Sequence, residues 1–156
     1  VRYLLKHILP GEVNLSYDNS GKPLCSSGFV SISHSCKYAA VIYSKNRPVG
    51  IDIEQVTPRI LRIEKRFLSE EELAFMLPGD EGLFHRYLAW SAKEAIFKLS
   101  GNSELSFSEN IRIFPFRPES EGVFNAEVLL TDGILRLTPA YKKYSDHSLV
   151  WVIKEA

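Results

Sequence analysis

The chain lacks net charge and long apolar runs, and each absence excludes a class of protein. It has 19 lysines and arginines against 19 aspartates and glutamates, so its overall charge gives no indication of binding to nucleic acid or to an anionic membrane surface. No apolar run approaches the roughly 20 residues that a membrane-spanning helix needs. We therefore expect neither nucleic acid nor a membrane among its partners.

Cysteine is also scarce, with only Cys25 and Cys36, and their spacing is not that of metal ligands. A secreted scaffold held by disulfides normally carries more cysteines, so we interpret both as reduced thiols of a cytoplasmic protein. The chain begins without Met, and residues 1–9 have the pattern of a helix entered midway. We therefore expect a preceding segment in the gene product.

What the chain does contain is enough apolar sequence for a core, because 45% of its 156 residues are hydrophobic. Alternating or apolar stretches bounded by turn-forming residues predict short strands. These are 13–17, 29–33, 38–43, 49–54, 111–114, 124–130, 134–139 and 149–153. The second, third and fourth are joined by short connections and predict an antiparallel meander. We expect a turn at 18–23 and an exposed loop at 142–147.

Three helices are predicted between the two groups of strands. The first covers 59–67, and the second opens at Ser69, which forms a capping box with Glu72 and precedes a helix that ends near Pro78. The third covers 80–100 and stops at a glycine. Together with the strands, these helices predict an α+β fold of two related lobes, 1–56 and 57–156.

The helix at 80–100 has two distinct faces. Four apolar residues recur at helical spacing and predict a buried stripe: Leu88, Ala92, Ala95 and Leu99. A second stripe recurs every four residues and contains Trp90, Glu94 and Lys98. A helix with two such faces packs against the core on one side. We interpret the other side as the binding site of a phosphate-bearing ligand with its metal ion.

Asp52 and Glu54 are the matching carboxylates on the strand at 49–54, where they point to the same side. With Glu94 they would supply three hard oxygen ligands, which suits Mg²⁺. Gly50 lets a ligand or another backbone approach closely. The alternative is two exposed carboxylates at a strand end, with Glu94 in an i,i+4 pair with Lys98.

Several other side chains have both a structural and a functional interpretation. Lys93 and Lys98 are either solvated helix lysines or cations that neutralise phosphate. The segment Ser33-His34-Ser35 is either a capped strand end or a phosphate site, and no further histidine or aspartate completes a catalytic triad. Lys22 is either part of an ordinary turn or a cation held on a rigid one.

Glu72 and three arginines also have two interpretations. Capping explains Glu72 completely, whereas a functional Glu72 would act as general base for a hydroxyl. Arg59, Arg62 and Arg66 share one face of their predicted helix. They form either a solvated surface or a docking site for an acidic protein.

Taken together, these residues resemble the 4′-phosphopantetheinyl transferase superfamily. The family pattern is G-[IV]-D, about forty residues, then [FW]-[SCT]-x-K-E-x-x-x-K. Residues 50–54 (GIDIE) and 90–98 (WSAKEAIFK) fit every fixed position. Residues 21–23, 31–35 and 66–72 match further blocks of the surfactin-type branch, whereas 99–156 carry no motif.

The resemblance implies two α+β lobes related by pseudo-twofold symmetry, with coenzyme A in the cleft between them. It implies Mg²⁺-dependent transfer of the phosphopantetheine arm to a serine of an acyl or peptidyl carrier protein, with adenosine 3′,5′-bisphosphate as the other product. The pathway served would be lipid, polyketide or nonribosomal peptide biosynthesis. Two motif halves in one chain predict a monomer.

The resemblance also assigns roles to individual residues. Asp52, Glu54 and Glu94 would hold Mg²⁺ on the pyrophosphate. The coenzyme A site would contain Lys22, Pro23, Ser33, His34, Lys93 and Lys98. The catalytic residues would be Glu72, which assists deprotonation of the carrier serine, Glu94, and Lys98, which assists the leaving group.

The chain departs from the family at its start. Surfactin-type members carry tens of residues before the stretch matched by Val1–Lys6, including basic groups for the coenzyme A 3′-phosphate. Either the first lobe is incomplete in this sequence, or the 3′-phosphate is held differently. Two alternatives stay open, namely a non-catalytic relative that binds coenzyme A and an α+β interaction domain with incidental acidic residues.

Overall fold

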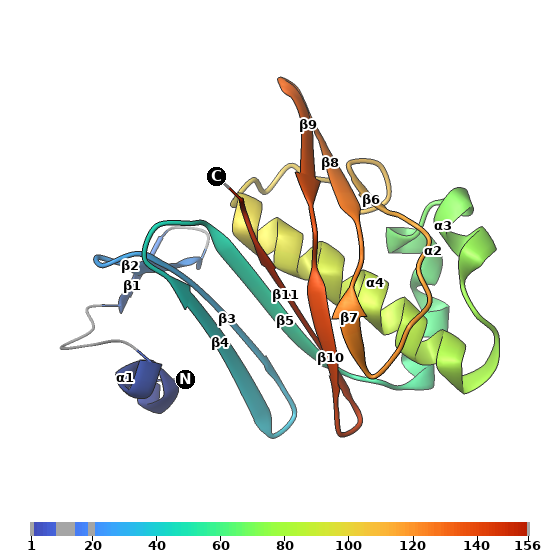
Figure 1. Cartoon of the computed structure of the whole chain (residues 1–156), viewed down its shortest axis with the longest axis horizontal. Helices are drawn as coiled ribbons and strands as arrows, with labels where there is room; N and C mark the ends of the chain where they lie inside the picture. The colour runs from blue at the N-terminus through green and yellow to red at the C-terminus, as the bar shows by residue number, and fades with distance from the viewer. Residues whose placement is uncertain (1, 9–14, 19–20, 156) are drawn as a thin grey trace.

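The computed structural model describes residues 2–8, 15–18 and 21–155, and it confirms the α+β class (Figure 1). The helices are α1 (Arg2–Ile8), the 3₁₀ helix η1 (Pro58–Arg62), α2 (Glu64–Phe67), α3 (Glu70–Phe75) and α4 (Gly79–Ser100). The strands are β1 (Leu15–Tyr17), β2 (Pro23–Cys25), β3 (Phe29–Ser35), β4 (Tyr38–Ser44), β5 (Val49–Gln55), β6 (Ile111–Ile113), β7 (Glu121–Val123), β8 (Ala126–Leu130), β9 (Gly133–Leu137), β10 (Ala140–Tyr144) and β11 (His147–Ile153). None of the described helices combines the length and apolar content needed to cross a bilayer.

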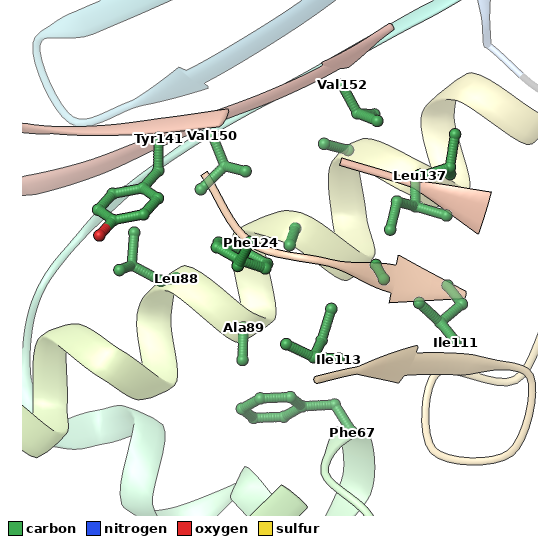
Figure 2. Close-up of a cluster of buried hydrophobic side chains, with 14 of the residues drawn as sticks. Phe67, Leu88, Ala89, Ile111, Ile113, Phe124, Leu137, Tyr141, Val150 and Val152 are labelled. Carbon is green, nitrogen blue, oxygen red and sulfur yellow. The ribbon is translucent and has the colours of Figure 1, made fainter. Parts of the chain in front are cut away.

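A four-stranded antiparallel sheet in the order β5-β11-β10-β7 lies at the centre, and α4 packs along it (Figure 1). The sheet β6-β8-β9 contributes to the same core, where Leu88 and Ala89 of α4 meet side chains of both sheets (Figure 2). At Gly50 a Cβ atom would lie 1.8 Å from the carbonyl oxygen of Ala95. The glycine therefore allows the backbones of β5 and α4 to approach closely.

The predicted meander is wrong, because β5 does not pair with β4. Strands β3 and β4 form a separate two-stranded sheet. Strand β5 pairs with β11, with seven pairs of Cα partners in register. Strand β3 lies beside β5 but is joined to it by side chains. Ser31, Ser33 and Ser35 accept hydrogen bonds at Oγ from the backbone N–H groups of Ile51, Ile53 and Gln55 respectively, at 3.1, 3.3 and 3.1 Å. We call these three bonds the serine ladder, and their constant offset means that β3 and β5 run in the same direction.

The prediction of one continuous helix over 59–67 is also wrong, because this segment forms two short helices, η1 and α2. Ile63 separates them with φ −120° and ψ −3°, and its N–H bonds to Ile60 in a tight i to i−3 turn. The predicted loop at 142–147 is mostly strand, since β10 and β11 form a hairpin there with Ser145 in the left-handed region at φ 55°. The loop prediction failed because polar side chains also occupy the exposed face of a strand.

Other predictions are confirmed. Ser69 and Glu72 form the complete capping box of α3, although that helix ends at Phe75 and not near Pro78. Leu88, Ala92, Ala95 and Leu99 are buried, and α4 ends at Gly101 in the left-handed conformation with φ 64°. The strand predicted at 13–17 is present from Leu15, while residues 13 and 14, and residues 19 and 20 of the predicted turn, lie outside the described residues. The lobe boundary and the pseudo-twofold relation stay predictions.

Candidate active site

Asp52 is the most buried of the three predicted metal ligands, with 3% of its surface exposed on β5. Its Oδ1 accepts hydrogen bonds from Ser33 Oγ at 2.8 Å and from Lys98 Nζ at 2.8 Å. Its Oδ2 is buried and has no hydrogen-bond partner among the described residues. A buried carboxylate oxygen without a donor is costly, so this atom fits a site that a cation completes.

Lys98 of α4 links the helix to β3 and β5. Besides Asp52, its ammonium donates to Ser33 Oγ at 3.2 Å and to the carbonyl oxygen of Ile51 at 3.2 Å. Its side chain keeps 28% of its surface exposed, so the charge is shielded from water only in part. Lys98, Asp52 and Ser33, which lie far apart in the sequence, therefore meet in one charged cluster.

Glu54 and Glu94 lie close enough to Asp52 to feel its charge. Burial and then the Asp52 carboxylate raise the pKa of Glu54, while the Trp90 indole opposes this by donating to Oε1 at 3.5 Å. Burial and then Asp52 likewise raise the pKa of Glu94, with Lys98 opposing. The three carboxylates thus repel one another, and a cation between them would relieve that repulsion.

The donor set fits Mg²⁺ in its chemistry, since all three groups supply hard oxygens. In the described part of the chain, no three acidic, histidine or cysteine side chains are already gathered closely enough to hold a metal ion. The three-carboxylate Mg²⁺ site therefore stays a prediction. Its support is the unpaired Asp52 Oδ2 and the mutual repulsion with Glu54 and Glu94.

A cavity of about 310 Å³ opens beside Lys98. Its lining includes Lys22 and Pro23, which the turn at Gly21, with φ 81°, carries to this place. Lys22 Nζ donates to the carbonyl oxygen of Leu99 at 3.4 Å, at the C-terminal end of α4. A second cavity of about 630 Å³ shares Lys22 and Pro23 with the first. Two lysines of the predicted coenzyme A site therefore line one hollow.

Lys93 and Glu72 lie elsewhere. Lys93 is fully buried, and its Nζ donates to Glu72 Oε2 and to three backbone carbonyls, all within 2.8 Å. Glu72 is 2% exposed, and its carboxylate also accepts from the N–H groups of Ser69 and Ile113. No hydrogen bond or ion pair among the described residues joins this pair to Asp52, Glu54 or Glu94.

The remaining predicted residues are exposed. His34 lies on β3 as an exposed residue next to Ser33 in sequence, and no hydrogen bond or ion pair joins it to the three carboxylates among the described residues. Arg59, Arg62 and Arg66 are exposed on η1 and α2, and none of them forms an ion pair with a described carboxylate. Arg59 and Arg62 lie on η1 and Arg66 lies on α2, so the single helix that would carry all three is absent.

Residue-by-residue reasoning missed two features of this site. Ser31 and Phe97 line the cavity beside Lys98, and Ser31 and Ser35 hold β3 against β5. The signal was available, because serines at 31, 33 and 35 alternate along a strand and therefore share one face. The stripe alone does not distinguish a solvent-facing side from contact with another strand, and the structure places it against β5.

Comparison with known proteins finds one matching family model and several curated proteins of similar sequence. Residues 48–151 match the family model described as the 4′-phosphopantetheinyl transferase superfamily. The 4′-phosphopantetheinyl transferase HetI of Nostoc sp. is 32% identical over 122 residues, which cover 70% of this chain and 51% of that protein. Sfp of Bacillus subtilis is 34% identical over 95 residues, which cover 58% of this chain and 42% of that protein. Psf-1 of Bacillus pumilus is 34% identical over 110 residues, with 63% and 47% covered. The chain spans about half the length of the curated relatives it matches.

Proposed function

Because the chain belongs to the 4′-phosphopantetheinyl transferase superfamily, we propose that it transfers the 4′-phosphopantetheine arm of coenzyme A to a serine of an acyl or peptidyl carrier protein. The observation that carries this proposal is the cluster of Asp52, Ser33 and Lys98 at the edge of a cavity that also contains Lys22. Such a cluster places carboxylates for a cation next to cations for phosphate, which is what transfer from a diphosphate requires.

In the proposed reaction the serine oxygen of the carrier attacks the phosphorus that bears the pantetheine arm. The bond from that phosphorus to the bridging oxygen breaks, and adenosine 3′,5′-bisphosphate leaves with the electron pair. Asp52, Glu54 and Glu94 would hold Mg²⁺, which when bound neutralises charge on the diphosphate oxygens. Lys22 lines the hollow beside these residues and would hold the phosphates, while Lys98, whose N–H bonds already go to Asp52, Ser33 and Ile51, would add positive charge beside them.

The serine hydroxyl must also lose its proton. Glu94 is a proposed Mg²⁺ ligand, and a carboxylate that holds a cation is not free to accept a proton, so the proton passes to solvent water. Glu72 is sealed in the interior, with both carboxylate oxygens already accepting hydrogen bonds. We therefore assign a structural role to Glu72.

The carrier protein would dock on the exposed arginines of η1 and α2. Carrier proteins are acidic, and Arg59, Arg62 and Arg66 offer three positive charges close in sequence to the β5 carboxylates. Leu61, between them, is 48% exposed and adds an apolar contact. This surface suits an acidic partner with a small apolar patch.

The deciding experiment is intact mass spectrometry of an apo carrier protein after incubation with this chain, coenzyme A and Mg²⁺. We expect a gain of one phosphopantetheine arm, abolished by EDTA and by Glu94→Gln, and retained by Glu109→Gln, which alters an exposed glutamate. No gain with several carriers, together with coenzyme A binding, would replace the transferase with a binding-only relative. Absence of coenzyme A binding would leave an interaction domain.

A further inference from the structure

The two oxygens of Asp52 have opposite surroundings. Oδ1 accepts two hydrogen bonds, one from a hydroxyl and one from an ammonium, both at 2.8 Å. Oδ2 is equally buried and accepts none from the described residues. The carboxylate therefore cannot exchange its two oxygens without breaking two charge-assisted hydrogen bonds in a buried place.

Ser33 is fully committed to this arrangement. A serine hydroxyl has one proton to donate and two lone pairs. The proton goes to Asp52 Oδ1, and the lone pairs accept from the N–H of Ile53 at 3.3 Å and from Lys98 Nζ at 3.2 Å. Because Ser33 is only 7% exposed, water does not compete for these positions. The hydroxyl is thus locked in one rotation.

Lys98 is committed in the same way. Its three N–H bonds match three acceptors, namely Asp52 Oδ1, Ser33 Oγ and the carbonyl oxygen of Ile51. All three lie on β3 or β5, so the ammonium joins the serine ladder to the carboxylate. Ser33 and Lys98 therefore hold Asp52 from two sides.

We propose that Ser33 and Lys98 clamp Oδ1 of Asp52, so that Asp52 presents only Oδ2 to a bound divalent cation and acts as a one-oxygen ligand. Ser33 is then a positioning residue for the metal, in addition to any contact with coenzyme A. This inference rests on the proposed function, because that proposal assigns the cation to Asp52. Residues that orient metal ligands in this way typically contribute about 10- to 100-fold to metal affinity.

Glu54 is a second predicted metal ligand whose carboxylate is not held by hydrogen bonds in the way that Asp52 is. It therefore serves as the comparison for Asp52. Among the described residues, the Glu54 side chain accepts one hydrogen bond, from the Trp90 indole at a long 3.5 Å, so its carboxylate can turn. An amide at position 54 can therefore still offer its oxygen to a cation. At position 52 the clamp would bind the amide oxygen in the place of Oδ1 and leave the NH₂ group facing the cation.

The test is binding of Mn²⁺, as a probe for the Mg²⁺ site, followed by electron paramagnetic resonance on the whole chain without coenzyme A. Asp52→Asn and Glu54→Gln each remove one negative charge. We expect Asp52→Asn to weaken binding about tenfold or more beyond Glu54→Gln, because only Asp52 is clamped. Equal losses from the two substitutions would overturn the clamp.

Ser33→Ala tests the positioning role directly. We expect Mn²⁺ binding to weaken about 10- to 100-fold, with most of it restored by Ser33→Thr, which keeps the hydroxyl. The matched control is Ser35→Ala, which removes another bond of the serine ladder without touching Asp52. Equal effects of Ser33→Ala and Ser35→Ala would reduce Ser33 to a structural role. If the wild-type chain binds no Mn²⁺, the metal assignment of the proposed function fails instead.

Discussion

Lys93 Nζ lies 2.7 Å from Glu72 Oε2, and both side chains are withdrawn from solvent, with 0% and 2% of their surface exposed. The ammonium also donates to the carbonyl oxygens of Phe67, Phe107 and Ile111, on three separate segments. Burial lowers the pKa of Lys93, and the Glu72 carboxylate opposes that shift. This lysine of the family motif therefore joins α4 to α2, α3 and β6 through the interior.

We predict that Lys93→Met lowers the free energy of unfolding by about 3–5 kcal/mol, because it leaves the buried Glu72 carboxylate without its countercharge and three carbonyls without the Lys93 donor. The measurement is chemical denaturation followed by circular dichroism. The control is Arg112→Met, which breaks the ion pair with Glu71 at the same 2.7 Å distance but at 53% and 74% exposure. That exposed pair should contribute less than about 1 kcal/mol. Similar losses at both positions would contradict the interior role of Lys93.

Glu72→Gln separates a structural glutamate from a general base. We predict a loss of stability, because the amide cannot match the charge of Lys93, and transfer activity that falls only with the folded fraction. The measurements are kcat at a temperature where the variant is fully folded, and the melting temperature. A large fall in kcat at unchanged melting temperature would restore the general-base role to Glu72.

Protonation of His85 is expected to lower the stability of the fold in acid. His85 is completely buried between the rings of Phe75 and Phe116, and burial followed by the charge of Arg86 lowers its pKa from 6.5 to about 4. His85 takes up a proton near pH 6.5 in the unfolded chain but only near pH 4 in the folded protein. The stability that the neutral, buried His85 provides is therefore complete above pH 6.5. That contribution is lost as the pH falls toward 4, by about 2 kcal/mol between pH 7 and 5.

The experiment on His85 compares unfolding free energies of wild type and His85→Gln between pH 7.5 and 5. We predict that the difference between the two proteins shrinks or reverses as the pH falls, since glutamine does not titrate. Glu54 and Glu94, whose pKa values are raised, act in the opposite direction and cancel in this difference. A constant difference across the range would refute the role of His85.

Gly50→Ala should destabilise the protein by about 3 kcal/mol or more, because its Cβ would overlap the Ala95 carbonyl and push β5 from α4. Gly79→Ala is the comparison, since that position has open space and only a positive φ of 66°. Its cost should be about 1 kcal/mol. Thermal or chemical denaturation of both variants provides the check, and a cost at Gly50 no greater than at Gly79 would be evidence against the close approach.

Reversing Arg59, Arg62 and Arg66 to glutamate should raise KM for the carrier protein about tenfold or more, with little effect on kcat or on KM for coenzyme A. The control reverses Lys45, Arg47 and Arg117, which are exposed on other segments and give the same change in net charge. Steady-state kinetics at low ionic strength make the comparison. An unchanged KM for the carrier in the first variant would exclude this docking surface.

Local spacing was sufficient to predict which of the candidate residues share a face. The four-residue recurrence of Trp90, Glu94 and Lys98 placed them on one face of α4, and alternation along β5 placed Asp52 with Glu54. The capping box of Ser69 and Glu72 was predicted completely, because a helix cap depends only on residues three positions apart. Such features depend on contacts between near neighbours.

Tertiary structure decided what local spacing could not. Period and turn residues do not say which strand edge pairs with which, so the pairing of β5 with β11 and the serine ladder to β3 came only from the packed fold. Lys93 and Lys98 look alike on the helix, yet one is sealed against Glu72 and the other reaches Asp52. Residue spacing alone is enough to show which chemical groups share a helix face or a strand face. Burial and long-range contacts determined which of those groups meet, because both depend on segments far apart in the chain.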